Sequence, residues 1–225
     1  MRSKCSEDAA DVEAWPDDAD ARQALADYMR ELGVGSEVQP ELVAAFLDMR
    51  GARLAGIELS GAEFFGANLE SVDLSRACLG KADLRGAELS DANLSESWLM
   101  RAEAYECTAQ RTKFMAAQLL GADFSHADLR DADLRGAWLY HVRFLKADLR
   151  GADLRNAHFG PEDNRTSLGN AWLTGVQVEG ASGFVTGAAY VNDDVESLTG
   201  SDLESWFHEQ GASDVRVLPD PHPGH

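Results

Sequence analysis

The chain has little cysteine and no long apolar run. Its three cysteines, Cys5, Cys78 and Cys107, are odd in number and widely spaced, so the sequence predicts neither a disulfide framework nor a zinc site. No stretch reaches the roughly 18 apolar residues of a membrane helix, and the opening residues, MRSKCSEDAA, lack the apolar core of a secretory signal. We therefore expect a cytoplasmic protein without a membrane-spanning segment.

Basic residues are also scarce, because 20 Lys and Arg face 39 Asp and Glu, a net charge of −19. Binding to phosphates requires a basic surface, so direct nucleic-acid binding is disfavoured. The acidic excess is uneven: residues 1–51 carry −7, residues 52–159 carry −3, and residues 160–225 carry −9. The central region is nearly neutral, and the negative charge gathers at the two ends of the chain.

Sequence motifs for catalysis are missing. The chain has no nucleophile elbow, phosphate-binding loop, zinc motif or dinucleotide fingerprint. His141 and His158 are predicted to lie near each other, yet no third ligand or orienting acid accompanies them. The sequence thus predicts a protein that is not an enzyme and that uses no metal and no cofactor.

What the chain does have is a five-residue repeat. Counting by fives from Leu54 to Phe159 gives 22 positions, of which fifteen are Leu and five are Phe; Ala104 and Ala109 are the exceptions. The position two residues earlier is Ala in 16 of the 22 units. A period of five fits neither the 3.6 residues of a helical turn nor the alternation of a strand. Each unit is therefore expected to form one side of a coil that buries its Leu or Phe.

Segments such as ADLRG (82–86) and ADLRD (127–131) show the unit in its plainest form. The repeat resembles the pattern A-(D/N)-L-x-x of the pentapeptide-repeat family. The resemblance implies an all-β solenoid, a right-handed quadrilateral β-helix with four units and twenty residues per turn. It also implies a function, because several bacterial members bind DNA gyrase or topoisomerase IV, imitate duplex DNA and protect the enzyme from quinolones. C-terminal ends make dimers in several members, which implies a homodimer through the C-terminal region.

With twenty residues per turn, residues twenty apart should stack on one face of the coil. One outward column contains Trp98 and Trp138, and its neighbour contains Met100 and Tyr140. We call the predicted cluster the aromatic face; its members are Trp98, Met100, Leu120, Trp138, Tyr140 and His158. A contiguous exposed apolar surface is typical of interaction sites. Two interpretations remain open: the face binds a protein, peptide or hydrophobic small molecule, or a tail of the chain folds over it.

A second outward feature is a set of stacked arginines. Arg130 and Arg150 share one column, and Arg135 and Arg155 share the next. They are candidates for contact with an anion or an acidic partner. The alternative is pairing with the aspartates of their own units, which contributes little to stability at a surface.

The repeat divides the chain into regions. We predict a disordered N-terminus over 1–16, a helical N-terminal cap over 17–51, the β-helix over 52–183 with a register slip near 160–166, a C-terminal extension over 184–218, and a disordered tail over 219–225. Apolar spacing predicts cap helices over Asp17–Leu32 and Pro40–Met49. In the C-terminal extension it predicts a helix over Ser201–Gln210 and a strand over Val215–Leu218.

Overall fold

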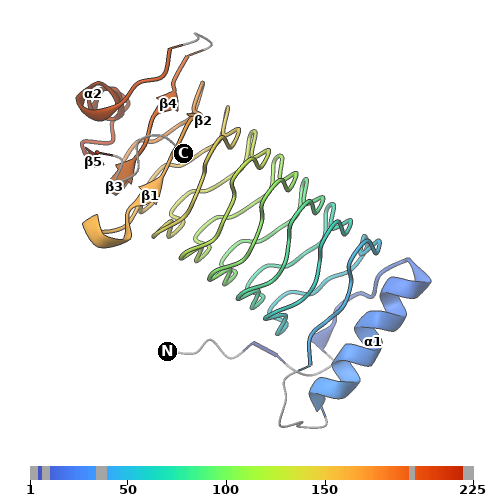
Figure 1. Cartoon of the computed structure of the whole chain (residues 1–225). Helices are drawn as coiled ribbons and strands as arrows, with labels where there is room; N and C mark the ends of the chain where they lie inside the picture. Colours follow the sequence, from blue (N-terminus) through green and yellow to red (C-terminus); the bar gives the residue numbers. More distant parts are fainter. Residues whose placement is uncertain (1–4, 7–10, 34–39, 193–195, 220–225) are drawn as a thin grey trace.

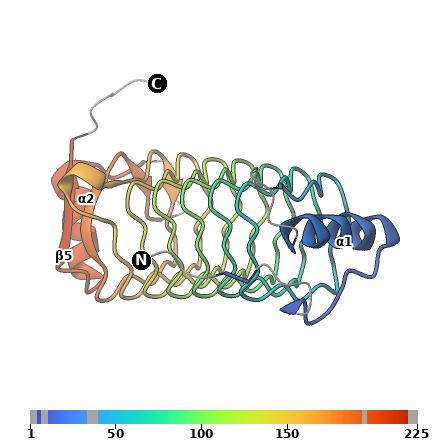
Figure 2. The ribbon, with the colours of Figure 1, turned by 90° about the horizontal axis from the view of Figure 1, so that it is seen from below.

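The computed structural model describes residues 5–6, 11–33, 40–192 and 196–219. The chain forms an elongated coil, with helix α1 (Ala19–Gly33) at its N-terminal end and helix α2 (Gly200–Glu209) at its C-terminal end (Figures 1 and 2). The predicted tail over 219–225 lies, apart from residue 219, outside the described residues. Within the described part of the chain, no helix has the length and apolar character needed to cross a membrane.

The coil is built from hydrogen bonds between residues about twenty apart. Parallel bridges join Asp83 to Glu103 and Glu103 to Asp123, and the same spacing holds from Val43 to His158. Within each unit a turn changes the direction of the chain, as where the Ala87 N–H donates to the Leu84 carbonyl at 3.1 Å. The residue before that N–H has positive φ, as at Gly86 (φ 62°), a conformation that glycine adopts without steric cost. Five residues therefore complete one side and one corner.

The residue before each central position supports the turn. The carboxylate of Asp73 accepts a hydrogen bond from the Ser75 N–H at 3.0 Å, and the amide oxygen of Asn68 accepts one from the Glu70 N–H at 3.1 Å. Short side chains with an oxygen acceptor fit this role. This is the physical reason for Asp and Asn at that place in the repeat.

The interior of the coil is the core predicted from the repeat. All twenty Leu and Phe of the central positions are buried, as are Ala104 and Ala109. The rings of Phe114 and Phe124 meet at 5.6 Å, and those of Phe124 and Phe144 at 6.0 Å. Cys107 is buried at an inward small-residue position, as predicted, and burial raises the pKa of its thiol to about 12.

The coil begins earlier than the sequence predicts, and the helix predicted over Pro40–Met49 is wrong. Val43 and Asp48 bridge Glu63 and Asn68, so two further repeat units occupy this segment. Phe46 has φ 60°, which an α-helix cannot contain. The repeat pattern does not reveal these units, because large and small residues have exchanged positions in them. The central position at 44 is Ala, whereas the small-residue positions at 42 and 47 are Leu.

Helix α1 confirms the predicted helix over Asp17–Leu32. Its buried residues form one apolar side of the helix, namely Ala21, Leu25, Tyr28, Met29 and Leu32. The Asp18 carboxylate accepts a hydrogen bond from the Ala21 N–H at 2.9 Å, which stabilises the first turn. The Tyr28 hydroxyl donates to the Glu58 carbonyl at 2.6 Å and so fixes the helix to the coil.

The prediction of a disordered N-terminus over 1–16 is wrong for the described residues of that segment. Ser6 bridges Ile57 and Ala14 bridges Arg53, so the segment adds to the edge of the coil. Val12 is buried in the core. Backbone hydrogen bonds along the coil thus hold a segment whose polar composition favours disorder.

The register changes near residue 160, as predicted. The loop contains the short helix η2 (Glu162–Asn164), and the bridges beyond it span 24 residues, as from Arg143 to Ser167. The remaining elements are β1 (Thr166–Ser167), β2 (Ala171–Trp172), β3 (Ser182–Thr186), β4 (Ala189–Tyr190), α2 and β5 (Asp214–Leu218). Parallel pairing gives one sheet in the order β1-β3-β5 and another of β2 and β4.

Helix α2 and strand β5 confirm the helix and strand predicted for the C-terminal extension. Leu203 and Phe207 are the buried residues of α2. The Phe207 ring lies 5.9 Å from the ring of Phe159, the last central residue of the regular repeat. Apolar contact between α2 and the core thus continues the interior past the end of the repeat.

Candidate functional site

The aromatic face lies along one column of the coil, as the twenty-residue spacing predicts. Bridges connect Glu58, Cys78, Trp98, Gln118, Trp138 and His158 in that order, and the column continues from His158 to Ser182. Trp138 is 44% exposed and Met100 is 38% exposed. Trp98, Leu120, Tyr140 and His158 are half-buried. The structure therefore brings the predicted residues together and leaves Trp138 as their most exposed member.

Trp138 contacts aromatic rings on two sides. Its ring lies 5.4 Å from that of Tyr140, nearly edge-on, and 4.7 Å from the imidazole of His158. The His158 Nδ1 and the Ser182 Oγ are 3.3 Å apart, so the imidazole is also held from the next turn of the coil. A rigid, partly exposed aromatic cluster of this kind loses little conformational entropy when a partner binds.

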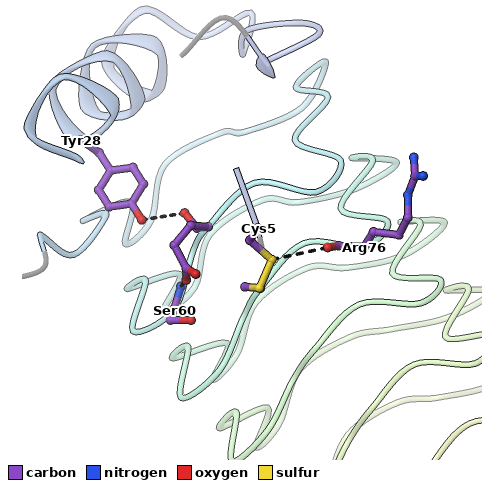
Figure 3. The surroundings of a disulfide bond; sticks show 6 residues. Cys5, Tyr28, Ser60 and Arg76 are labelled. Atoms are coloured by element: carbon purple, nitrogen blue, oxygen red, sulfur yellow. Dashed lines mark hydrogen bonds between the residues drawn. A yellow bond between two sulfur atoms is a disulfide. The ribbon is translucent and has the colours of Figure 1, made fainter. Parts of the chain in front are cut away.

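Residues 5 and 6 lie at the other end of the same column. Cys5 is joined to Cys78 by a disulfide, with a Cα–Cα distance of 6.0 Å (Figure 3). The sequence predicts no disulfide framework, and this cross-link corrects that prediction for one pair of cysteines. Cys5 and Cys78 are 73 residues apart in sequence, so their spacing gave no signal. The outward position of Cys78 in the predicted column was the available clue, since a free thiol there would face solvent.

The stacked arginines pair with aspartates of their own units. Arg130, Arg135, Arg150 and Arg155 each donate from Nε and Nη2 to the aspartate two residues earlier, with Nη2–Oδ2 distances of 2.5–2.6 Å. Each pair is bidentate. This is the pairing with aspartates of the same unit that the sequence offered as the alternative to binding an anion or acidic partner. Contact with an anion or acidic partner stays a prediction, and the guanidinium groups would have to leave these carboxylates to make it.

The same pairs make the folded chain sensitive to acid. Hydrogen bonds from Arg130, Arg135 and Arg155 lower the pKa of Asp128, Asp133 and Asp153. Because the folded-state pKa is depressed, the stabilisation is present above the ordinary aspartate pKa of about 3.9 and is lost as the pH falls through the folded-state value. We expect the thermal unfolding midpoint to be flat from about pH 7 to pH 5 and to fall below about pH 4.

A triple substitution of Asp128, Asp133 and Asp153 to Asn tests this origin. Asn68 occupies the equivalent place in its own unit and accepts the same backbone hydrogen bond, so the turn should survive. At neutral pH each change should cost less than about 1 kcal/mol, and the fall of the midpoint in acid should become shallower. An unchanged acid slope in differential scanning calorimetry would assign the effect to other carboxylates.

Two further aromatic pairs were not predicted. Phe46 and Phe65 meet at 5.1 Å near the start of the coil, with Phe46 72% exposed. Trp172 and Tyr190 stack at 4.4 Å in a column that continues from Asp148 and is separate from that of Trp138. The first pair includes Phe46, which lies in the segment for which a helix was predicted. The second pair lies beyond the loop at 160–165, where the spacing between bridged residues changes.

The five-residue turns and the twenty-residue bridges define a coil that repeats every four units. The sequence pattern of the family described as pentapeptide repeats matches residues 47–80, 67–103 and 117–156, with 8 copies. Residues 47–103 and 117–156 are therefore pentapeptide repeats, as the resemblance of the sequence indicated. A comparison with curated protein sequences found no match.

Solved structures of similar shape include a trypsin-treated form of QnrB1, described as a plasmid-mediated fluoroquinolone resistance protein. It is 20% identical, the match covers 78% of this chain and 79% of that one, and the TM-score is 0.53. HetL, a pentapeptide repeat protein involved in heterocyst differentiation regulation in the cyanobacterium Nostoc sp. strain PCC 7120, is also 20% identical. Its match covers 89% and 98% of the two chains, with a TM-score of 0.36. At this identity, the likeness to QnrB1 concerns the fold alone.

Proposed function

We propose that this chain is a non-catalytic, cytoplasmic protein-binding rod whose contact surface is the aromatic face. The observation that carries the proposal is the exposure of Trp138 beside Tyr140 and His158 on a rigid coil. Trp and Tyr contribute a large share of binding energy at protein interfaces. A surface held by bridges above and below presents these rings without a change of backbone.

For the partner we propose a bacterial type II topoisomerase, DNA gyrase or topoisomerase IV. Support comes from the family resemblance, from the elongated form of the coil, and from the fluoroquinolone-resistance role of QnrB1, a protein of similar fold. The finer architecture that we infer, a right-handed quadrilateral β-helix with helical caps, agrees with this role. A homodimer through the C-terminal region stays a prediction.

The charge pattern supports the proposal that the aromatic face, and not the acidic columns, is the contact. Asp128, Asp133, Asp148 and Asp153 are each neutralised by an arginine two residues later. The repeat region from 52 to 159 carries only −3. A partner that recognises dense negative charge would find little of it along these columns, whereas Trp138 offers apolar contact.

The experiment is a supercoiling assay with purified DNA gyrase and a fluoroquinolone. We expect the chain to reduce drug-induced cleavage or to inhibit supercoiling, and the Trp98→Ser, Trp138→Ser double variant to lose this effect. The matched control is Trp172→Ser, which removes a tryptophan from a separate column. No effect of the unaltered chain on either activity would remove gyrase as the partner.

The alternative function is a scaffold or carrier that binds another protein, a peptide or a hydrophobic small molecule on the Trp98/Trp138 surface. Support for it comes from the half-buried state of Trp98, Leu120 and Tyr140, which leaves part of each apolar side chain accessible to a ligand. In either case the free energy of unfolding of the double tryptophan variant should lie within about 0.5 kcal/mol of that of the unaltered chain, as is usual for surface substitutions. A large loss of stability in chemical denaturation would show that the face is part of the core.

A further inference from the structure

A cluster of metal-binding side chains lies at the end of the aromatic column that residues 5 and 6 contact, outside the proposed contact surface. The cluster consists of Cys5, Glu58 and Cys78, and one donor atom from each lies within 4.8 Å of the other two. Cys78 is buried, whereas Cys5 and Glu58 are half-buried. Two sulfurs and a carboxylate oxygen form a donor set that suits Zn²⁺.

Contacts other than the disulfide hold these three residues together. The Ser6 N–H donates to the Gly56 carbonyl at 2.8 Å, and the Glu58 N–H donates to the Ser6 carbonyl at 2.9 Å. Cys5 therefore stays beside Glu58 when its covalent bond to Cys78 is broken. The bridge from Glu58 to Cys78 is part of the coil itself, so all three positions belong to a preformed frame.

The Glu58 side chain is also oriented. Its Oε1 accepts a hydrogen bond from the Ser60 N–H at 2.8 Å, and its main-chain carbonyl accepts one from the Tyr28 hydroxyl at 2.6 Å (Figure 3). Hydrogen bonds that orient a ligand in this way typically raise metal affinity. The Cys5 sulfur lies 3.7 Å from the Arg76 carbonyl oxygen, which adds a further oxygen at the edge of the cluster.

We propose that the thiol form of this cluster is a zinc site, with Cys5, Cys78 and Glu58 as ligands and water in the fourth position. Tetrahedral bonds of 2.0–2.3 Å require donor separations of roughly 3.3–3.8 Å, so the two sulfurs must move apart once their covalent bond is broken. To reach the thiol form, the Cys5–Cys78 disulfide accepts two electrons and two protons from a dithiol reductant. The reductant is itself oxidised to a disulfide. Zn²⁺ then replaces both thiol protons, which are released. Oxidation and metal binding therefore exclude each other.

Either state fastens the N-terminal segment to the coil. In a reducing compartment, where disulfides rarely persist, the metal would replace the covalent link between residue 5 and residue 78. The sequence predicts no zinc site because the cysteines are widely spaced, but the coil brings Cys5 and Cys78 together. The inference is independent of the proposed partner, because it concerns the end of the column that residues 5 and 6 contact.

The test is zinc titration of the full chain, reduced with dithiothreitol and freed of it by anaerobic gel filtration. Isothermal titration calorimetry should find one Zn²⁺ per reduced chain and none per oxidised chain. Titration with Co²⁺ should show thiolate-to-metal charge-transfer absorption. Cys5→Ser and Cys78→Ser should abolish both signals, and Glu58→Gln should weaken affinity by roughly tenfold or more. Cys107→Ala, which removes the buried third thiol, is the matched control and should bind as the unaltered chain does.

Several outcomes would overturn the proposal. These are no zinc uptake by the reduced chain, undiminished uptake by Cys5→Ser or Cys78→Ser, or unchanged affinity in Glu58→Gln, which keeps both sulfurs. Circular dichroism of each metal-free variant shows whether it folds. If a cysteine variant does not fold, Glu58→Gln and the comparison of oxidised with reduced chain decide the matter.

Discussion

Replacing Phe124 with alanine is expected to destabilise the folded chain by about 3–5 kcal/mol. The Phe124 ring is buried and lies between the rings of Phe114 and Phe144 in the middle of the coil. The bridges of neighbouring turns fix the backbone on both sides, so the structure has little freedom to close the space left by the ring. The loss should be measured by chemical denaturation, with the midpoint and slope compared between the two proteins.

The control for this substitution is Met115→Ala, one residue after the central Phe114. Met115 is 41% exposed, so its removal should change the free energy of unfolding by no more than about 0.5 kcal/mol. The two variants lose comparable apolar volume from inward and outward positions of nearby units. Equal losses would contradict the assignment of inward and outward positions throughout the coil.

Replacing Cys78 with serine is expected to produce the second large effect, a loss of about 2–4 kcal/mol in the oxidised, metal-free protein. The disulfide closes a loop whose ends are 73 residues apart, and a cross-link over a long loop strongly restricts the unfolded chain. The substitution removes the covalent link between residue 5 and the coil and leaves the bridges at Ser6 and Ala14 in place. The measurement is the denaturation midpoint without reductant, compared with that of the unaltered chain.

Two comparisons make this second prediction specific. Adding a reductant in the absence of metal should lower the midpoint of the unaltered chain to that of Cys78→Ser and leave the variant unchanged. Cys107→Ala should retain sensitivity to the reductant, because Cys107 is not bonded to another cysteine. If the reductant does not change the denaturation midpoint of the unaltered chain, the disulfide adds no stability.

The regular part of the coil could be predicted because each unit repeats one solution to the same packing problem. A large residue such as Leu84 points inward, a small residue such as Ala82 lets the walls approach, and Asp83 supports the turn. Once the period was known, the bridge from Trp98 through Gln118 to Trp138 followed without further information. The aromatic face was therefore predictable as a set of positions.

The remaining features depend on contacts that periodicity does not encode. At 44 and 47 the exchange of small and large residues imitated the apolar spacing of a helix, and only backbone bridges to the next turn decided otherwise. Cys5 reaches Cys78 because hydrogen bonds lay the N-terminal segment along the coil. The loop at 160–165 likewise contacts the coil where the Asn164 carbonyl accepts a hydrogen bond from the His141 N–H at 2.7 Å. Each of these is a long-range contact made by a segment outside the regular repeat.

The most direct test of the central claim is the affinity of purified DNA gyrase for the unaltered chain and for Trp138→Ser. If the aromatic face is the contact, the variant should bind about 30-fold more weakly, corresponding to the roughly 2 kcal/mol of an interface hot spot, and Trp172→Ser should bind as the unaltered chain does. Equal affinity for the unaltered chain and Trp138→Ser, or no binding by either, would contradict the account.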